Sequence, residues 1–247
     1  MDKLLYVAMS GAKQNMNALA VRANNLANVN TDGFRADLAQ ARSMQAFGEG
    51  LPTRVFAMTE SPGHNFDSGP IKTTGRNLDI AIKDSGWIAV QAEDGGEAYT
   101  RSGSLNFDST GLLTNARGNP VMGETGPIVL PIPVDKVQIS PEGIISVRPQ
   151  GATADVIEEV ARIKLVNPSN ANMMRGEDGL FRLTSGQNIP SDPNVQVESG
   201  ALEGSNVNAV SEMVALIDIQ RQYEMQVKMM KNAEELDRSS SSLLRVS

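Results

Sequence analysis

The stretch LYVAMSGAKQNMNALAVRANNLANVNTDGF, which spans Leu5–Phe34, decides how the rest of the chain is organised. Its apolar residues recur at alternating steps of four and three, which is a period of 3.5 residues. These seam positions are Leu5, Met9, Ala12, Met16, Leu19, Ala23 and Leu26. This spacing predicts a helix whose narrow apolar seam needs a partner helix. We expect the helix to end between Asn28 and Gly33, because Asn and Gly readily take the left-handed conformation that closes a helix.

The side of this helix away from the seam carries no charge. It is formed by Ser10, Gln14, Asn17, Val21, Asn24, Asn25 and Asn28. Helix surfaces that face water usually carry Lys and Glu, whereas small amides and hydroxyls suit a face packed against other chains. The alternative is that Asn24–Asn30 marks only a fraying helix end, since Asn is a poor residue in mid-helix. The lack of charge favours the packed face.

A second helix is expected at the other end of the chain, where Asn206–Arg238 contains neither Gly nor Pro. The same four-three stepping returns there in Met213, Leu216, Gln220, Tyr223, Val227 and Met230. Asn208 is a suitable N-cap, and Glu212 places an acid in the first turn. Isolated helices of this length are marginal in water. The simplest arrangement therefore pairs the two terminal helices side by side, in a coiled-coil-like manner, and leaves each a second face for neighbouring molecules.

Between the helices, the hydrophobic pattern changes to period two, as in Leu78–Ile82. Short strands separated by Gly, Pro, Asn and Asp turns are typical of an all-β sandwich or barrel-like domain. The expected fold class is therefore a mainly β central domain with long N- and C-terminal α-helices. The expected domains are an N-terminal assembly helix (1–34), a connecting arm rich in Gly and Pro (35–70), a β-rich outer domain (71–204) and a C-terminal assembly helix (205–247).

Composition excludes several classes of function. The 247 residues carry a net charge of −7, with no basic run, which argues against a nucleic-acid partner. There is no Cys, so disulfides and thiolate chemistry are excluded. No apolar run approaches the roughly 18 residues that a membrane-spanning helix needs, so we expect no membrane insertion. The N-terminus shows no basic region followed by an apolar block, so we expect no cleaved secretory signal.

Candidate chemistry is sparse. His64 is the one histidine and lies in turn-like sequence, while a zinc site needs three or four ligands. Asn106–Gly111 is similar to the start of a calcium loop, but its twelfth position is Arg117, where a bidentate Glu is required. We therefore expect a hairpin turn at Asp108–Gly111. No catalytic, cofactor-binding or metal-binding residue is predicted, and no cofactor.

Two carboxylate pairs leave an enzyme as an alternative. Asp79 with Asp84, or Glu158 with Glu159, are the pairs that a β-fold hydrolase acting on cell-wall polymer would use, since glycosidases use two carboxylates. However, the alternation in Leu78–Ile82 predicts that Asp79 faces out of a strand, and the Glu pair is expected on a solvated surface. A further alternative is a binding module that dimerises through a coiled-coil tail. We favour a non-enzymatic structural protein.

Two terminal motifs together closely resemble the bacterial flagellar basal-body rod and hook protein family. They are Ala23–Phe34 and Ser199–Val207, the second followed by Val210, Glu212, Met213, Arg221, Tyr223 and Glu224. The likeness to the family's β domain is carried by Leu78–Ile82, Gly86-Trp87, Tyr99–Gly103, Gly111–Leu113 and Gly118–Val121. The resemblance covers nearly the whole chain, and the two terminal motifs are specific only in combination.

Within that family, the chain is most similar to the proximal rod subunits. Gly204 stands where a distal rod subunit is expected to have Met, and the arm between Phe34 and Ile71 has no long insert. A distal rod or hook-type axial protein is the alternative. The resemblance implies export by the flagellar type III apparatus without signal cleavage, and assembly into the hollow axial shaft that crosses the periplasm.

The resemblance also implies the partners and the surfaces that meet them. Both terminal helices are expected to form the inner tube, with the β domain outside them. The expected partners are further copies of the chain, other rod subunits, adjoining axial proteins and the export apparatus. The expected assembly interface comprises the seam positions of both helices together with Asn24, Asn25 and Asn28.

Overall fold

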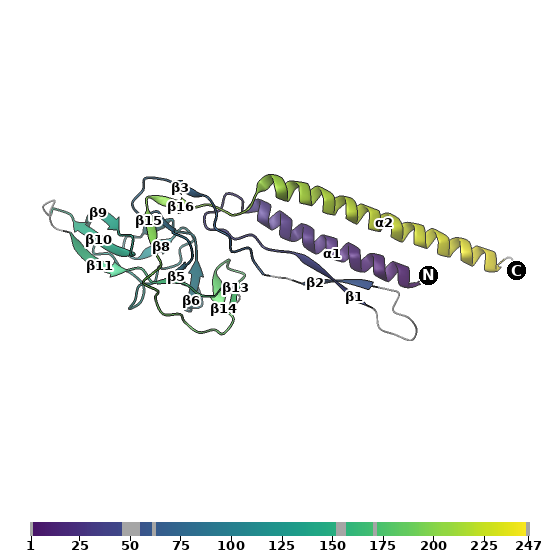
Figure 1. Cartoon of the computed structure of the whole chain (residues 1–247), viewed down its shortest axis with the longest axis horizontal. Coiled ribbons are helices and arrows are strands. Elements are labelled where there is room, and N and C mark those ends of the chain that lie inside the picture. Colours follow the sequence, from purple (N-terminus) through teal and green to yellow (C-terminus); the bar gives the residue numbers. More distant parts are fainter. Residues whose placement is uncertain (1, 46–54, 61–62, 152–156, 170–171, 246–247) are drawn as a thin grey trace. The chain divides into compact units, whose positions relative to one another are not determined.

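The computed structural model describes residues 2–45, 55–60, 63–151, 157–169 and 172–245. Along the chain, a mainly β central region follows an N-terminal helix and precedes a C-terminal helix, as the sequence predicts (Figure 1). The chain divides into two compact units. The helical unit comprises Met1–Val29, Ala36–Asn65 and Val207–Ser247, and the β unit comprises Asn30–Arg35 and Phe66–Asn206.

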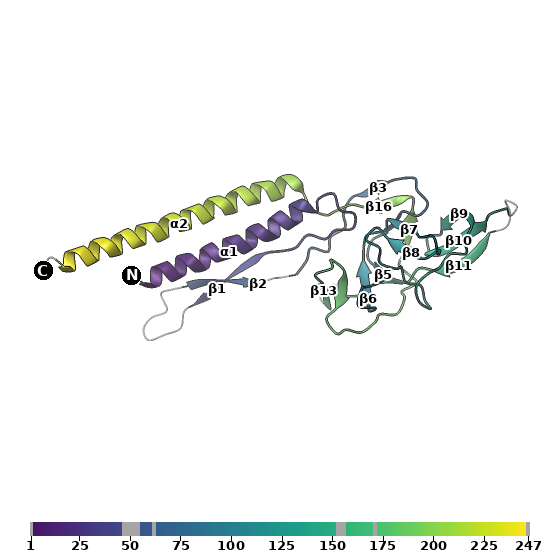
Figure 2. The same ribbon diagram turned by 180° about the vertical axis from the view of Figure 1, so that it is seen from behind.

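The helical unit is built on α1 (Asp2–Ala27) and α2 (Ala209–Arg245), which lie side by side and antiparallel (Figures 1 and 2). The Oδ1 atom of Asn208 accepts hydrogen bonds from the backbone N–H groups of Val210 and Ser211, at 3.0 and 3.2 Å. The predicted N-cap is thus confirmed. The helix continues past Arg238 through the serine-rich run that follows, to Arg245.

A β-hairpin occupies part of the segment that we expected to be a connecting arm. Its strands β1 (Gln40–Gln45) and β2 (Val55–Glu60) pair in antiparallel register, and β2 runs next to α1 (Figures 1 and 2). At its base, the Asn65 N–H donates to the Ala36 carbonyl at 2.8 Å. The period-two rule missed these strands because β1 reads QARSMQ, which has no apolar alternation.

The β unit consists of short strands that pair only in antiparallel fashion. They are β3 (Ile71–Thr73), β4 (Ile80–Ile82), β5 (Trp87–Gln91), β6 (Glu97–Thr100), β7 (Leu105–Phe107), β8 (Leu113–Asn115), β9 (Val134–Ile139), β10 (Ile144–Pro149), β11 (Glu158–Arg162), β12 (Leu165–Val166), β13 (Met173–Arg175), β14 (Phe181–Leu183), β15 (Val197–Ser199) and β16 (Ala201–Glu203). The largest sheet has the order β12-β5-β6-β14-β13, and the next has the order β11-β10-β9. The described strands also form three two-stranded sheets, β15-β4, β16-β3 and β7-β8. A sandwich or barrel stays a prediction.

Beyond Leu78–Ile82, the hydrophobic pattern predicts strands at Trp87–Val90, Pro120–Met122, Ile128–Leu130, Val137–Ile139, Ile144–Val147, Ala161–Val166, Leu180–Leu183 and Val195–Val197. Most of these overlap strands of the structure, and the exceptions have local reasons. Pro120–Met122 and Ile128–Leu130 make only isolated bridges, which suits segments interrupted by proline. The run Ala161–Val166 is divided between β11 and β12. The predicted turn at Asp108–Gly111 is confirmed: Asp108 Oδ1 accepts from the backbone N–H groups of Thr110 and Leu112, and Gly111 has a φ of 85°.

The core of the β unit is mainly aliphatic, as the low aromatic content requires. Its largest cluster includes the fully buried side chains of Ile80, Ile88, Leu105, Leu113 and Ile145. A smaller aromatic cluster joins Trp87, Tyr99 and Phe181, together with the partly buried Phe66. The centroids of the Trp87 and Phe181 rings are 4.7 Å apart.

Asp79 is placed differently from our prediction. It is buried, and its carboxylate accepts hydrogen bonds from Thr74 Oγ1 at 2.8 Å and from Arg76 Nη1 at 3.2 Å. The alternation argument failed because β4 begins only at Ile80, and all three of its residues are buried. Glu158 and Glu159 are exposed, as predicted.

Candidate assembly interface

The predicted seam of α1 is divided between two surfaces of the helix. Four positions spaced seven apart are buried or half-buried: Leu5, Ala12, Leu19 and Leu26. The other three positions, Met9, Met16 and Ala23, are exposed, and the two methionines leave 56% and 51% of their surface in water. One half of the heptad pattern therefore faces the interior of the helical unit, and the other half faces out.

The predicted seam of α2 is divided in the same way. Leu216, Tyr223 and Met230, again seven apart, are half-buried, as is Val227, whereas Met213 and Gln220 are exposed. The buried stripe of α2 instead includes Glu212 and Ala233. Sequence reasoning treated Glu212 only as a first-turn acid, because a charged residue rarely marks a buried position.

Among the described residues, an ion pair and a close approach at a glycine join the two helices. Arg22 Nη1 lies 2.8 Å from Glu212 Oε1. Gly11 faces Gln226 so closely that a Cβ atom at Gly11 would lie 2.6 Å from the amide nitrogen Nε2. The lack of a side chain at Gly11 thus leaves room for Gln226 of α2.

Asn25 anchors α1 to the segment that follows it. Its side chain is fully buried; Nδ2 donates to the Asp37 carbonyl, and Oδ1 accepts from the Asp37 N–H, both at 2.9 Å. The Asp37 carboxylate in turn lies 2.6 Å from Nδ1 of His64, which is half-buried. Neighbouring Asn24 is exposed, and Asn28 Nδ2 donates to the Asn24 carbonyl at the helix end. The asparagines therefore differ in role.

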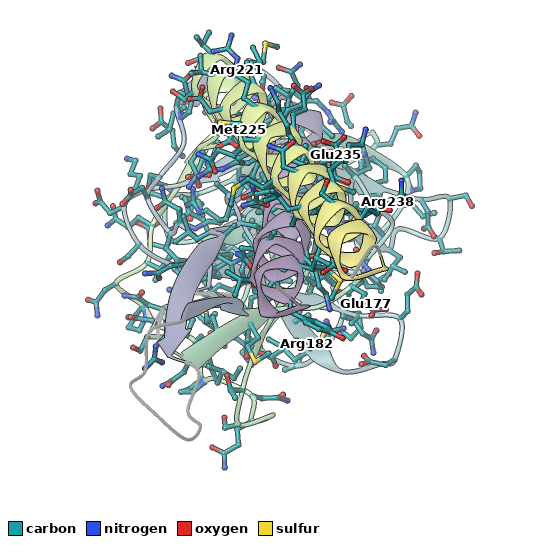
Figure 3. All side chains as sticks on the ribbon, turned by 90° about the vertical axis from the view of Figure 1, so that its right-hand side faces the viewer. Glu177, Arg182, Arg221, Met225, Glu235 and Arg238 are labelled. Atoms are coloured by element: carbon teal, nitrogen blue, oxygen red, sulfur yellow. The ribbon has the colours of Figure 1, made fainter. Side chains whose placement is uncertain are left out.

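In its first turns, α2 carries apolar residues on the side opposite the Glu212 side chain, which faces α1. At 100° per residue, Val210, Val214 and Ile217 fall on the side opposite the buried Glu212, and each leaves more than half of its surface in water. Arg221 continues this side, and Met225 lies beside it; both side chains are on the surface of α2 in Figure 3. Exposed apolar side chains gathered on one side of a helix are candidates for a binding surface.

A metal site requires several ligands close together, and a membrane-spanning helix requires a long apolar stretch. The His, Asp and Glu residues that the structure describes include no group of three placed to hold a metal ion, and its described helices include none with an apolar stretch long enough to cross a membrane. A groove of about 350 Å³ in the β unit contains Arg76 and Asp135, but these form ion pairs with Asp79 and Arg148.

The two terminal sequence motifs meet inside the β unit. The Gly33 N–H donates to the Glu203 carbonyl at 2.7 Å, and the Asn206 N–H donates to the Phe34 carbonyl at 3.3 Å. Gly33 has a φ of 69°, and a Cβ atom there would lie 2.3 Å from the carbonyl carbon of Arg101. Burial lowers the pKa of Arg101, although the nearby Glu203 carboxylate opposes this shift.

Comparisons with known proteins agree with this geometry. The model described as "Flagella basal body rod protein" matches residues 5–35, and "Flagellar hook protein FlgE/F/G D1 domain" matches residues 81–147. The model "Flagellar basal body rod FlgEFG protein C-terminal" matches residues 198–243. The chain is 42% identical to the flagellar basal-body rod protein FlgF of Escherichia coli (strain K12), with all of both chains covered. The chain belongs to the flagellar basal-body rod protein family.

Other members of the rod protein family support a FlgF-like chain. The identity is 40% to FlgF of Salmonella typhimurium, over the full length of both chains. It is 37% to FlgF of Caulobacter vibrioides, over 97% of each chain, and 30% to the rod protein FlgG of Agrobacterium fabrum, over 95% of this chain and 96% of FlgG. The first and last rod family models together cover both motifs that meet at Glu203.

Proposed function

We propose that this FlgF-like chain is a structural subunit that polymerises through α1 and α2 into the hollow axial shaft of the flagellar basal body. Family membership supports the rod. Three FlgF proteins are 37–42% identical to the chain, whereas the FlgG proteins reach 30–31%, which supports the proximal over the distal rod, although two further FlgF proteins are only 31–32% identical. In this proposal the chain acts by assembly and has no catalytic activity.

The observation that carries the proposal is the outward half of each helical seam. Met9 and Met16 on α1 and Met213 on α2 occupy seam positions, but each leaves more than half of its surface in water. A seam of period 3.5 is suited to packing against another helix. We infer that copies of the chain and adjoining axial proteins cover these positions, with the coiled-coil-like pairing predicted from the sequence. A heterologous contact of this kind, if it does not close, produces a helical filament.

The remaining expectations form part of the same proposal. The interface would comprise the outward seam positions of both helices and the exposed Asn24, and the four sequence-derived domains would act as assembly helices, arm and outer domain. Export by the flagellar type III apparatus without signal cleavage would bring the subunit to a shaft that crosses the periplasm. Partners would be other rod subunits and that apparatus.

Single cysteines test the interface, because the native chain has none. Met16→Cys places a thiol on the outward half of the α1 seam, and Ala12→Cys places one on the buried half. Both variants are expressed in cells that lack the native gene. In purified basal bodies the single thiol is labelled with a maleimide that carries a benzophenone group, which on illumination inserts into a C–H bond of whatever protein lies next to it. We expect Met16→Cys to give crosslinked products containing a neighbouring subunit and Ala12→Cys to give none.

The control is swimming, which both variants must restore before their crosslinks are compared. Equal crosslinking of the two variants, or crosslinking from Ala12→Cys alone, would contradict the proposed orientation of α1. Absence of both variants from purified basal bodies of swimming cells would contradict the rod assignment itself.

A further inference from the structure

Glu203, the last residue of β16, is a buried carboxylate at the centre of a bonded cluster. It is 1% exposed. Its Oε1 atom lies 2.8 Å from Arg35 Nη2 and accepts the Gly69 N–H at 2.9 Å. Its Oε2 atom accepts from Arg101 Nη1 at 2.9 Å. The Glu203 carboxylate thus binds Arg35, Gly69 and Arg101, which come from three segments far apart in the sequence.

Further hydrogen bonds connect the same segments. Arg35 Nη1 donates to the Asp67 carbonyl at 2.7 Å, and Asn206 Nδ2 donates to the same carbonyl at 3.0 Å. The bonds from Gly33 to Glu203 and from Asn206 to Phe34, given above, close the network. All of these atoms belong to the β unit.

The network lies where the chain passes from one unit to the other. The chain crosses between the units after residues 29, 35, 65 and 206. Arg35 and Asn206 are the last residues of the β unit before the crossings at 35 and 206. Asp67 is the second residue of the β unit after the crossing at 65. The bonded residues therefore adjoin three of the four crossings.

The chemistry of the cluster favours positioning over simple stabilisation. Burying ions is costly, and apolar residues of similar volume often stabilise a core as well or better. Charge-assisted hydrogen bonds also have a fixed geometry, so they hold the bonded groups in one relative orientation. The backbones are also in close contact: a Cβ atom at Gly69 would lie 2.1 Å from the Gly204 carbonyl oxygen. The arrangement therefore leaves the segments little freedom while the carboxylate is bonded.

We propose that Glu203 is a junction clamp: its carboxylate holds segments 33–35, 67–69 and 203–206 together, so that the chain enters and leaves the β unit at fixed points. Glu203 acts here as a positioning residue. Its value to a load-bearing shaft rests on the proposed function, because a subunit whose connections pivot freely transmits torque poorly. The clamp itself does not depend on assembly.

Limited trypsin digestion of the purified full-length chain tests the clamp. Arg35 is itself a trypsin site and is almost completely buried, so the Arg35–Ala36 bond reports opening of the junction. Lys164 lies in the same unit and is bound to Glu97 at 2.7 Å, so cleavage after Lys164 reports unfolding of the β unit as a whole. Mass spectrometry separates the fragments. Cleavage rates follow the population of the open form.

We expect Glu203→Gln to accelerate cleavage after Arg35 by about tenfold or more, because two buried guanidinium groups lose their counterion. Cleavage after Lys164 should stay at the wild-type rate. Glu198→Gln, an exposed change in β15, is the matched control and should behave as wild type at both sites.

Glu203→Asp keeps the charge but shortens the side chain, so it serves if Glu203→Gln does not fold. It should also accelerate cleavage after Arg35, by a smaller factor, with Lys164 unaffected. The proposal is overturned if Arg35 stays protected in Glu203→Asp, or if cleavage after Arg35 and after Lys164 accelerates equally, because Glu203 would then only stabilise the unit. Since no assembly occurs in this assay, its outcome is separate from that of the crosslinking test.

Discussion

At Gly33, one hydrogen atom in place of a side chain allows two sequence motifs to meet. The residue combines a left-handed backbone with an approach to Arg101 that no Cβ atom can share. Gly75 has a similar φ of 74°, but a Cβ atom there would meet nothing within 4 Å. A side chain at either position would raise the free energy of the fold through the strained backbone, but only at Gly33 would it also clash with another segment. Comparing the two positions therefore separates the two effects.

Gly33→Ala should destabilise the β unit by about 3 kcal/mol or more, since it adds a backbone clash to the strain of a positive φ. Gly75→Ala should cost about 1 kcal/mol, which is the strain alone. Guanidinium unfolding followed by fluorescence of Trp87, the one tryptophan of the chain, measures both. Equal losses in the two variants would show that the segments separate easily at Gly33.

Tyr99 makes the stability of the β unit sensitive to high pH. Burial, the largest cause, raises the pKa of its hydroxyl to about 12, and the hydroxyl oxygen accepts the Ile189 N–H at 3.1 Å. The folded state therefore keeps the proton where the unfolded chain, with a tyrosine pKa of about 10, has lost it. This contribution is complete below pH 10 and is lost as the pH rises from 10 to 12.

We expect the wild-type chain to lose about 1 kcal/mol of stability per pH unit in that window through Tyr99. Tyr99→Phe should cost about 1 kcal/mol at pH 8, because Ile189 loses its acceptor, and should depend less on pH above 10. Guanidinium unfolding at pH 8, 10 and 11 compares the two chains. If the unfolding free energies of the two chains changed with pH in the same way, Tyr99 would ionise equally in the folded and unfolded states, and the prediction would be wrong.

At the scale of an element, α1 has two faces with different partners. Gly11 leaves room for Gln226 of α2, the fully buried Asn25 binds the segment that leads to the hairpin, and the methionines at positions 9 and 16 are exposed. The heptad pattern indicated a helix with a seam but did not indicate which half the same chain would cover.

Asn25→Ala should destabilise the helical unit by about 2 kcal/mol, because the Asp37 backbone loses both the donor and the acceptor that the side chain supplies. Asn24→Ala is the matched control, since Asn24 is exposed, and should change stability by less than about 0.5 kcal/mol. Hydrogen exchange at the Asp37 amide, with thermal unfolding followed by circular dichroism, measures the effect. Unchanged exchange at Asp37 in Asn25→Ala would mean that the amide is protected by other contacts.

For the whole molecule, the strands β3–β16 lie within Ile71–Glu203, and their buried core is formed within that range. Removing Ala209–Ser247 should therefore leave Trp87 in its native environment but abolish swimming. The reason is that α1 loses the ion pair from Arg22 to Glu212, and an isolated helix is marginal in water.

Complementation of cells that lack the native gene tests this truncation, with the full-length chain at the same expression level as the control. Trp87 fluorescence and resistance of the Lys164 site to trypsin check that the β unit is folded. Normal swimming with the truncated chain would contradict the role proposed for the terminal helices.

The sequence by itself determined both helices, most strands of the β unit, the N-cap at Asn208 and the rod protein family, because periodicity, turn residues and short motifs are local properties. It misplaced Asp79, did not indicate that the first-turn acid Glu212 is buried, and gave no sign of β1 and β2. The burial of Glu212 and the pairing of unpatterned strands depend on groups distant in the sequence, such as Arg22 opposite Glu212. The Arg76 partner of Asp79 is only three residues away, but a local pattern does not show that the pair folds into the interior rather than into water. Only the tertiary structure supplied those partners, and with them the cluster around Glu203.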